Sequence, residues 1–327
     1  MDSREHGLKA GCFLFLAGLV FLLLGAGCSS GSDSDSSPPA GTPTGEGRVQ
    51  RLGFDLDGYE RTYDLYVPAG YTGSSPVPLV LDFHGIYQNA EVERETSGFQ
   101  AKADEEGFAV AYPQGILGPG GRTWNADPSD RQWFSWASIV DVDDVAFAVE
   151  VVEDVKRRLN IDASRVYVTG LSQGGAMALL AAHDRGDVFA AVSGVSTALL
   201  KDLDDYAPVR PIPVVQFHSY DDQIVPYRGS ELAGLPPIED AVRQWAIANG
   251  CNAAPQVTGL GFTDPDHPDV EEKLTVYGGC TDGVEVRLYS LHGTHTLYET
   301  NFHGDTEARK EQYVTDLAWD FLSRFTL

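Results

Sequence analysis

The chain has 327 residues, of which 43% are hydrophobic and 10% aromatic, so it can bury a core of ordinary size and is not a disordered, coiled-coil or collagen-like protein. Its 48 acidic and 23 basic residues give a formal net charge of −25, which argues against binding to nucleic acid or to anionic lipid headgroups. Four cysteines are too few for a disulfide-dense scaffold, and none lies in a CxxC zinc pattern.

Residues 1–27 have the organisation of a lipoprotein-type signal peptide. A short polar start with Arg4 and Lys9 precedes an uncharged apolar run, residues 10–27, which ends in small residues before Cys28. This ending resembles a bacterial lipobox, in which the cysteine is lipidated, although the leucine stands one place further from Cys28 than usual. An uncleaved membrane anchor is the alternative, because ~18 apolar residues nearly span a bilayer. Both interpretations predict an exported protein.

Residues 28–47 are predicted to be a tether between this segment and the folded part. They are rich in Ser, Gly, Pro and Asp and show no apolar periodicity, so they cannot form a packed element. Cys12 and Cys28 both fall in the signal region. Cys251 and Cys280 are then the only pair in an oxidising compartment, and we predict a disulfide between them.

The remaining residues, 48–327, are predicted to form a single α/β domain. Alternating polarity over residues 49–67, on either side of Asp57-Gly58, indicates an N-terminal antiparallel hairpin. Later apolar runs are typical of buried parallel strands, at residues 78–85, 107–115, 165–170, 212–219 and 284–291. Apolar residues also recur at helical spacing within residues 145–159, 241–246 and 314–322. This alternation predicts a mostly parallel central sheet with helices on both faces.

The motif with the clearest chemical meaning is Gly170-Leu171-Ser172-Gln173-Gly174, which lies between a predicted strand and a predicted helix. This is the context of a nucleophile elbow, whose tight turn requires glycine on both sides and exposes the serine hydroxyl. A Gly-rich turn without catalytic meaning is the alternative. Placement between a strand and a helix favours Ser172 as a nucleophile.

Two aspartates and three histidines are candidates for the partners of this serine. A serine hydroxyl needs a base to take its proton, and the base needs an acid to fix its tautomer. Asp221 and Asp222 follow one predicted strand, and His292, His295 and His303 follow the last one. The order serine, aspartate, histidine is that of α/β-hydrolases, and parallel sheets place their sites at these strand ends.

An oxyanion hole is predicted at the corner Phe83-His84-Gly85-Ile86, which closes an early strand. The backbone N–H groups of Ile86 and Gln173 would hold the developing negative charge. Two weaker features have structural alternatives. Three aspartates before a helix favour capping over a calcium site: Asp141, Asp143 and Asp144. Three tryptophans either stack on an aromatic or polyester substrate or pack beneath their loop: Trp124, Trp133 and Trp136.

These motifs resemble those of the extracellular polyhydroxybutyrate depolymerase-like and feruloyl esterase-like serine esterases, which have the α/β-hydrolase fold. The resemblance covers nearly all of the chain after the tether, including PLVLDFHGIYQNA, DASRVYVTGLSQGG, FHSYDDQIVPYRG and GTHTL. In this family the acid lies in a segment like HGTADxxVPY and the base in a segment like GGHTW. The resemblance therefore assigns these roles to Asp222 and His295. The family also often carries a cysteine pair like Cys251 and Cys280.

The resemblance implies an exported serine carboxylic-ester hydrolase with the triad Ser172, His295 and Asp222 and an acyl-enzyme intermediate. Its substrate would be a small-molecule or polymeric ester, and its location the cell envelope, as a lipoprotein attached through an N-terminal lipid anchor, or the extracellular medium. We expect no metal, no cofactor and no nucleic-acid partner. The alternatives are a catalytically silent cell-surface binding lipoprotein on the same fold, and a serine peptidase with the same triad.

Overall fold

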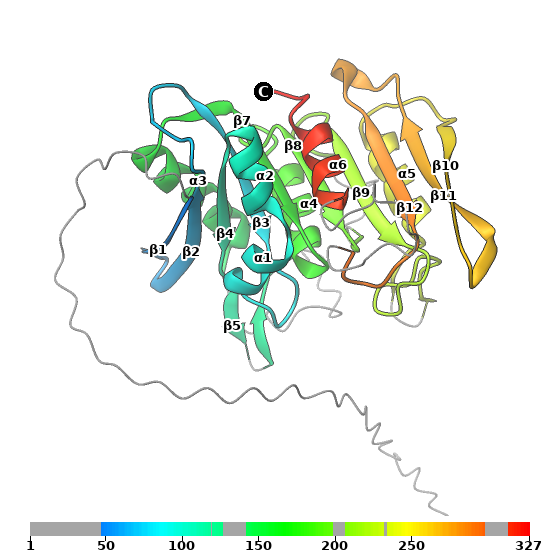
Figure 1. Ribbon diagram of the computed structural model, residues 1–327, viewed down its shortest axis with the longest axis horizontal. Helices are drawn as coiled ribbons and strands as arrows, with labels where there is room; N and C mark the ends of the chain where they lie inside the picture. The colour runs from blue at the N-terminus through cyan, green and yellow to red at the C-terminus, as the bar shows by residue number, and fades with distance from the viewer. Residues whose placement is uncertain (1–46, 119, 127–141, 199–206, 232–233, 298–312) are drawn as a thin grey trace, which may run out of the picture. The chain divides into compact units, whose positions relative to one another are not determined.

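In the part of the chain that the structure describes, ten strands form one mixed sheet with the order β1-β2-β4-β3-β7-β8-β9-β12-β11-β10 (Figure 1). This computed structural model describes residues 47–118, 120–126, 142–198, 207–231, 234–297 and 313–327. The predicted signal peptide, Cys28 and nearly all of the tether lie outside these residues. Among the described residues, no helix is long and apolar enough to cross a membrane.

The central strands of this sheet, from β4 to β12 in the order above, are parallel, and the strands at both edges are antiparallel to their neighbours. The strands are β1 (Arg48–Leu56), β2 (Tyr59–Val67), β3 (Val77–Phe83), β4 (Ala109–Pro113), β7 (Ile161–Gly170), β8 (Ala191–Val195), β9 (Val214–Ser219), β10 (Gln256–Asp264), β11 (His267–Tyr277) and β12 (Val286–Leu291). A separate two-stranded ribbon consists of β5 (Ile116–Gly118) and β6 (Gly121–Thr123).

Helices cover both faces of the sheet (Figure 1). They are α1 (Ala90–Thr96), α2 (Phe99–Glu106), α3 (Asp144–Arg158), α4 (Gln173–Asp184), α5 (Ile238–Ala248) and α6 (Tyr313–Leu322), with a short 3₁₀ helix η3 (Thr281–Gly283). One core cluster contains Met177 of α4 and Trp245 of α5, and a second contains Phe99 of α2 and Trp319 of α6. The predicted α/β-hydrolase fold with an N-terminal antiparallel hairpin is confirmed.

The strand β3 shows why apolar runs without alternation form the centre of this fold. Leu79 and Leu81 belong to one core cluster, whereas Val80 between them belongs to the other. Successive side chains of a strand point to opposite faces, so a strand covered on both sides must be apolar at nearly every position. The sequence prediction of buried parallel strands rested on this property.

A second antiparallel hairpin, β10–β11, forms the opposite edge of the sheet and was not predicted. Its first strand is mostly exposed, with a mixture of Thr, Gly and Phe, and its register shifts near Thr263. An exposed strand of this kind lacks a continuous apolar face, so its sequence carries a weak signal. The predicted 107–115 strand is limited to β4, and the predicted 165–170 strand extends back to Ile161 in β7.

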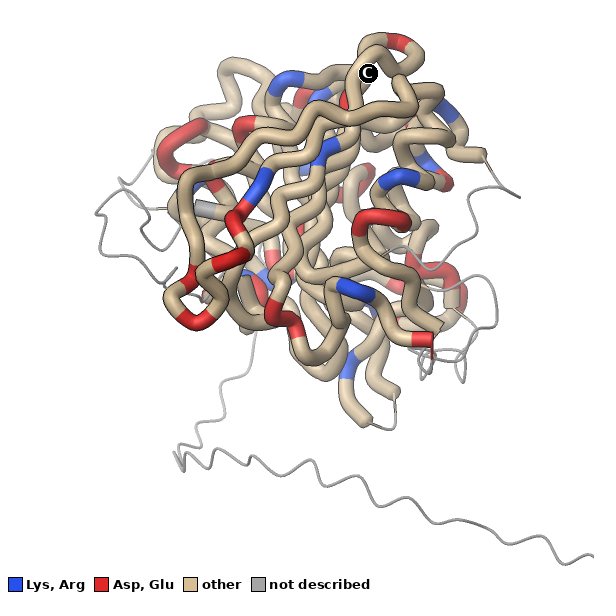
Figure 2. The backbone as a smooth tube through the Cα atoms, turned by 90° about the vertical axis from the view of Figure 1, so that its right-hand side faces the viewer, with Lys and Arg blue, Asp and Glu red and all other residues tan. Residues whose placement is uncertain are grey.

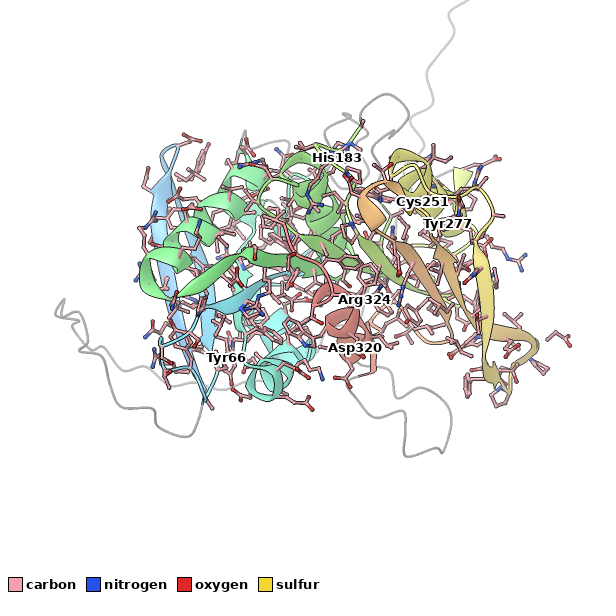
Figure 3. All side chains as sticks on the ribbon, turned by 90° about the horizontal axis from the view of Figure 1, so that it is seen from above. Tyr66, His183, Cys251, Tyr277, Asp320 and Arg324 are labelled. Carbon is pink, nitrogen blue, oxygen red and sulfur yellow. A yellow bond between two sulfur atoms is a disulfide. The ribbon has the colours of Figure 1, made fainter. Side chains whose placement is uncertain are left out.

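Cys251 and Cys280 are joined by a disulfide that connects the segment after α5 to the segment after β11. Figure 3 shows Cys251 beside Tyr277, the last residue of β11, and the carbonyl oxygen of Tyr277 lies 3.5 Å from Cys280 Sγ. The bond closes a loop across 29 positions of sequence, and this loop contains the whole β10–β11 hairpin. Disulfides are typical of proteins that mature in an oxidising compartment.

The acidic residues before α3 have structural roles. The side chain of Asp143 accepts a hydrogen bond from the N–H of Ala146, so it caps the helix. Asp144 is buried and forms an ion pair with Arg61. Asp141 lies outside the described residues. Elsewhere, Figure 2 shows Asp and Glu spread over several loops with Lys and Arg scattered among them.

Candidate active site

Ser172 lies at a sharp turn between β7 and α4, with φ 56° and ψ −121°, a conformation that is strained for a residue with a side chain. The glycines on either side are required by close backbone contacts. A Cβ atom added to Gly174 would lie 2.0 Å from the carbonyl oxygen of Phe83, and one added to Gly170 would lie 2.5 Å from Gly174. The end of β3 therefore lies in close contact with the turn. The turn itself has the geometry of a nucleophile elbow.

Asp222 lies just after β9 and is held by hydrogen bonds to both of its carboxylate oxygens. Oδ1 accepts from the N–H groups of Ile224 and Val225, at 2.8 and 2.9 Å. Oδ2 accepts from Nδ1 of His295, at 2.8 Å. This geometry fixes the proton of the imidazole on Nδ1 and directs Nε2 away from the carboxylate, as a general base requires.

His218, on β9, is a further partner of Asp222 that the sequence did not indicate. Its Nε2 lies 3.3 Å from Asp222 Oδ2 and 2.8 Å from the carbonyl oxygen of Val225. Burial alone would raise the pKa of Asp222, but hydrogen bonds from His218 and His295 outweigh it and hold the pKa well below its usual range. Asp222 is therefore ionised at neutral pH and can stabilise a protonated His295.

The structure brings His295 to Asp222 but does not form a hydrogen bond between His295 and Ser172. Ser172 is 6% exposed and the His295 side chain 17% exposed, so both are largely shielded from solvent. Hydrogen bonds between nucleophile and base are often long without substrate and shorten in the reacting complex. The lack of a hydrogen bond between Ser172 and His295 is therefore compatible with a catalytic triad.

His292 makes a second Asp–His pair, with Asp221, and this pair is distinct from the first. Its Nδ1 lies 3.0 Å from Asp221 Oδ2, and its Nε2 lies 2.9 Å from the carbonyl oxygen of Val270. With both ring nitrogens engaged, His292 has no nitrogen available for the proton of Ser172. His303, the third candidate base, lies outside the described residues.

The predicted oxyanion corner after β3 is built around a buried histidine. His84 Nε2 accepts a hydrogen bond from the N–H of Gly115 at 2.9 Å, so its proton is on Nδ1, which donates to the carbonyl oxygen of Gly85 at 2.8 Å. Burial lowers the pKa of His84 to about 4, and the ring is neutral at pH 7. Trp124 is also buried, and its Nε1–H donates to the carbonyl oxygen of His84 at 2.8 Å. Trp124 therefore packs beneath its loop, while Trp133 and Trp136 lie outside the described residues.

The two predicted oxyanion donors are on adjoining segments. Leu171 N–H donates to the carbonyl oxygen of Phe83 at 3.2 Å, which ties the elbow to the end of β3. Gln173 is the first residue of α4, where backbone N–H groups point out of the helix. Its side chain accepts from the N–H of Trp124 at 3.1 Å, which holds the position of the helix start. Ile86 N–H donates to no residue in the described ranges.

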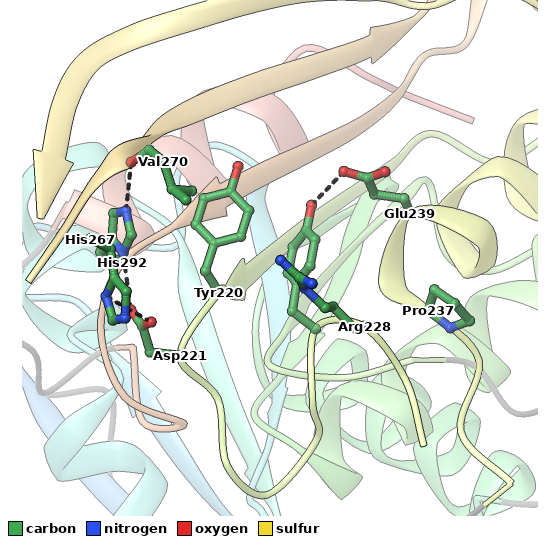
Figure 4. A pocket seen from close by; sticks show the side chains of 9 residues that line it. Tyr220, Asp221, Arg228, Pro237, Glu239, His267, Val270 and His292 are labelled. Carbon is green, nitrogen blue, oxygen red and sulfur yellow. Dashed lines mark hydrogen bonds and ion pairs between the residues drawn. The ribbon is translucent and has the colours of Figure 1, made fainter. Parts of the chain in front are cut away.

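A cavity of about 510 Å³ lies beside the acid loop (Figure 4). Neither Ser172 nor His295 lines it; its walls come from Tyr220, Asp221, Tyr227, Arg228, Pro237, Glu239, His267, Val270 and His292. Within this cavity, Asp221, His267 and His292 are close enough to hold one metal ion, with ligand atoms within 4.8 Å of one another. This cluster is not predicted from the sequence, because His267 lies on the unpredicted hairpin.

The mixed sheet, the strained serine after a central strand and the order serine, aspartate, histidine along the strand ends are those of an α/β-hydrolase. An acetyl xylan esterase from Aspergillus awamori has a similar fold, with a TM-score of 0.57 over 84% of this chain and 99% of that one, at 15% sequence identity. At this identity the likeness supports the fold alone.

Sequence comparison identifies the family of the chain within this fold. Residues 61–222 match the family model described as esterase PHB depolymerase. "Putative esterase NocK" of Nocardia uniformis subsp. tsuyamanensis is 30% identical over 81% of this chain and 74% of its own length. The chain belongs to this family of carboxylic ester hydrolases.

Feruloyl esterase B of Piromyces equi is 27% identical to the chain over 270 residues. These residues make up 80% of this chain and 44% of that protein, so the chain spans less than half the length of this relative. The matched residues make up 80% of this chain, so they include most of the α/β-hydrolase domain described above.

Proposed function

We propose that this protein is a serine carboxylic-ester hydrolase in which Ser172 is the nucleophile, His295 the general base and Asp222 the group that orients His295. The observation that carries the proposal is the combination of a strained elbow at Ser172 with a 2.8 Å hydrogen bond between Asp222 and His295. A glycine would adopt this backbone conformation without strain, so a strained serine between a strand and a helix indicates that its side chain has a function. Membership of the esterase family supports the same chemistry.

The reaction would proceed in two halves. His295 Nε2 takes the proton of Ser172 as Oγ attacks the ester carbonyl, and the carbon–oxygen bond to the alcohol then breaks as His295 returns the proton to the leaving oxygen. Water repeats the sequence on the acyl-enzyme and releases the carboxylic acid. Asp222 remains ionised throughout and stabilises the imidazolium, in agreement with its lowered pKa.

The tetrahedral intermediate of each half carries a negative oxygen. We infer that the backbone N–H groups of Ile86 and Gln173 hold it, because one follows β3 and the other begins α4, two segments that contact each other at the elbow. The neutral ring of His84 and the indole of Trp124 hold the corner in place, since both are buried and hydrogen-bonded to its backbone.

For the substrate, we propose an acyl ester of a sugar or a hydroxycinnamoyl or hydroxyalkanoyl ester. The relatives named above include a feruloyl esterase, and the structural neighbour is named as an acetyl xylan esterase. A neutral ester group suits a protein of net charge −25, because an anionic substrate would approach against the protein's own field.

The test is ester hydrolysis by wild type and Ser172→Ala on p-nitrophenyl acyl esters, methyl ferulate, acetylated xylan and polyhydroxybutyrate. Ser75→Ala is the matched control, since Ser75 is exposed in a loop. We expect Ser172→Ala to lose several orders of magnitude in kcat/KM at unchanged thermal stability, and Ser75→Ala to retain wild-type activity. Equal activity in both variants would refute Ser172 as the nucleophile.

The same panel, extended by peptide p-nitroanilides as amide substrates, separates the alternatives. A catalytically silent binding protein would show no turnover that depends on Ser172 for any ester. A serine peptidase would cleave peptide amides as well as esters and would lose both activities in Ser172→Ala. We expect turnover of at least one ester and none of the amides.

We also propose that the protein is exported and attached to the cell envelope through a lipid on Cys28. The apolar segment before Cys28 and the Cys251–Cys280 disulfide support export. Mass spectrometry of the membrane fraction should find a diacylated N-terminal Cys28, and Cys28→Ser should release the protein from that fraction. An unmodified chain that starts at Met1 would contradict lipidation.

A further inference from the structure

Three potential metal ligands from separate segments meet at one wall of the cavity in Figure 4: Asp221 after β9, His267 at the start of β11 and His292 after β12. We propose that these side chains bind one divalent transition-metal ion, and that Zn²⁺ matches the site best. The proposal concerns a site outside the triad and does not depend on the esterase function.

The ligand atoms are close enough to share a single ion, since one atom from each residue lies within 4.8 Å of the others. Asp221 Oδ2 lies 3.0 Å from His292 Nδ1, and the other carboxylate oxygen, Oδ1, lies 3.4 Å from His267 Nδ1. A tetrahedral zinc ion about 2.0 to 2.1 Å from each ligand separates neighbouring ligand atoms by roughly 3.3 Å. The two imidazole rings are parallel, with an interplanar angle of 3° and centroids 5.9 Å apart, and both have Nδ1 near the same carboxylate.

The hydrogen bonding of His292 indicates that a positive charge between His292 Nδ1 and Asp221 would be stabilising. Its Nε2 lies 2.9 Å from the carbonyl oxygen of Val270, which can only accept, so Nε2 carries the ring proton. Nδ1 then presents a lone pair to an oxygen of Asp221. Two acceptors 3.0 Å apart repel each other unless Nδ1 takes up a proton or a metal ion lies between them. A metal ion supplies this charge, and a ligating histidine usually donates its other N–H to a carbonyl or carboxylate, as here.

The surrounding contacts hold two of the ligands in position. The backbone N–H of His292 donates to Glu272 Oε1 at 3.0 Å, and the backbone N–H of Asp221 donates to Ser219 Oγ at 3.0 Å. Ser219 Oγ in turn donates to the carbonyl oxygen of Gly293 at 2.6 Å. The loops after β9 and β12 are therefore tied to each other, and pre-positioned ligands lose little entropy when an ion binds.

The ligand set selects the class of metal. Two imidazoles and one carboxylate suit zinc and its transition-metal neighbours, whereas calcium and magnesium prefer oxygen ligands alone. His292 is buried, but the His267 side chain is 53% exposed, so one side of the site is open to water. Three protein ligands and a water would complete a tetrahedral zinc site. Figure 4 shows Arg228, the cation of the cavity, on the far side of Tyr220 from the cluster.

The position of the site gives the ion a structural role next to the triad. Asp221 precedes the acid Asp222, and His292 lies three residues before the base His295. An ion shared by Asp221 and His292 would clamp the two loops that carry the acid and the base. It would also attach the edge hairpin β10–β11 to them through His267, so binding should raise the thermal stability of the protein.

The experiment titrates the exported protein, purified without a histidine tag and stripped with EDTA, with ZnCl₂ at neutral pH by isothermal calorimetry. We expect one zinc ion per chain and a higher Tm. His267→Ala and Asp221→Asn should each weaken binding at least ~10-fold and abolish the Tm shift. Asp269→Asn is the matched control, since it removes one exposed charge from the same hairpin and should change the affinity less than ~3-fold.

Two results would overturn the proposal. The absence of saturable zinc binding would mean that the cluster holds only a proton on His292. Equal zinc affinity in wild type, His267→Ala and Asp221→Asn would mean that the ion binds elsewhere on the acidic surface. Neither result bears on Ser172, because the binding and Tm readouts do not require catalysis.

Discussion

Two neighbouring aspartates and two nearby histidines divide into two Asp–His pairs with different surroundings. Asp222 binds His295 and leaves its Nε2 directed away, whereas Asp221 binds His292, whose other nitrogen is bonded to Val270. Sequence order alone did not separate these pairs. The family resemblance selected Asp222 and His295, and the hydrogen bonds give a physical reason for that choice.

The first prediction concerns Asp222. Asp222→Asn keeps the shape of the side chain, but one of its two terminal groups becomes NH₂. The amide oxygen is needed to accept from the N–H groups of Ile224 and Val225, so the NH₂ group faces Nδ1 of His295 and donates to it, and the imidazole takes the wrong tautomer. We expect kcat to fall about 10⁴-fold with a native circular dichroism spectrum. Asp269→Asn, on an exposed part of the edge hairpin, should hold wild-type kcat. An active Asp222→Asn enzyme would show that another carboxylate orients the base.

The second prediction concerns the pH dependence of stability that His84 causes. Burial lowers its pKa to about 4 in the folded protein, against ~6.5 in the unfolded chain. The unfolded state therefore binds more protons between these values, and stability is present in full above pH ~6.5 and lost as the pH falls toward 4. The loss from this one group is on the order of 3 kcal/mol.

Urea unfolding of wild type and His84→Gln between pH 8 and pH 4 measures this contribution. The difference in unfolding free energy between the two proteins should be constant above pH 7 and should shrink below pH 6. A constant difference over the whole range would mean that His84 takes up its proton in the folded state as easily as in the unfolded chain.

At the scale of elements, the junction between β3 and the elbow depends on the absence of a side chain at residue 174. Gly174→Ala would place a Cβ atom 2.0 Å from the carbonyl oxygen of Phe83, so either the end of β3 or the turn at Ser172 must move. We expect loss of at least ~10²-fold in kcat/KM, because a displacement of 1 Å can cost that much. Gly70→Ala, where nothing lies within 4 Å of the added atom, should have wild-type activity. Activity in Gly174→Ala equal to that of the control would contradict the tight junction.

The disulfide supports a different pair of elements. Replacing both Cys251 and Cys280 with serine should lower the free energy of unfolding by about 3 to 4 kcal/mol, since the loop across 29 positions regains its freedom in the unfolded chain. Esterase activity at 25 °C should persist, because the bond lies outside the site residues. The measurement is urea unfolding with and without reductant. Two thiols that react with iodoacetamide in the unreduced protein would contradict the bond.

The elements that the sequence predicted are those buried on both faces or marked by a tight turn. β3, β7, β9 and β12 are apolar runs, and the hairpin at Asp57-Gly58 has positive φ at both residues. The hairpin β10–β11 was missed because it is exposed and irregular. His267 lies on that hairpin, so the Asp221, His267 and His292 cluster could not be predicted either.

At the scale of the whole molecule, the catalytic candidates come from three segments that together extend over more than 100 residues, from Ser172 to His295, and parallel strands bring them together. β7, β9 and β12 are neighbours or near neighbours in the sheet, so the segments that follow them share one edge. The sequence predicted this convergence from strand order. It could not predict His218 or the His84–Trp124 contact, since each depends on how side chains from different layers pack.

The proposed mechanism requires that Ser172 becomes covalently acylated during turnover. Labelling of the folded protein with a fluorophosphonate, followed by peptide mass spectrometry, tests this step. We expect a single adduct on the peptide that contains Ser172, with none in Ser172→Ala and full labelling in Ser75→Ala. An esterase that remains unlabelled, or that carries the adduct at another residue, would contradict it.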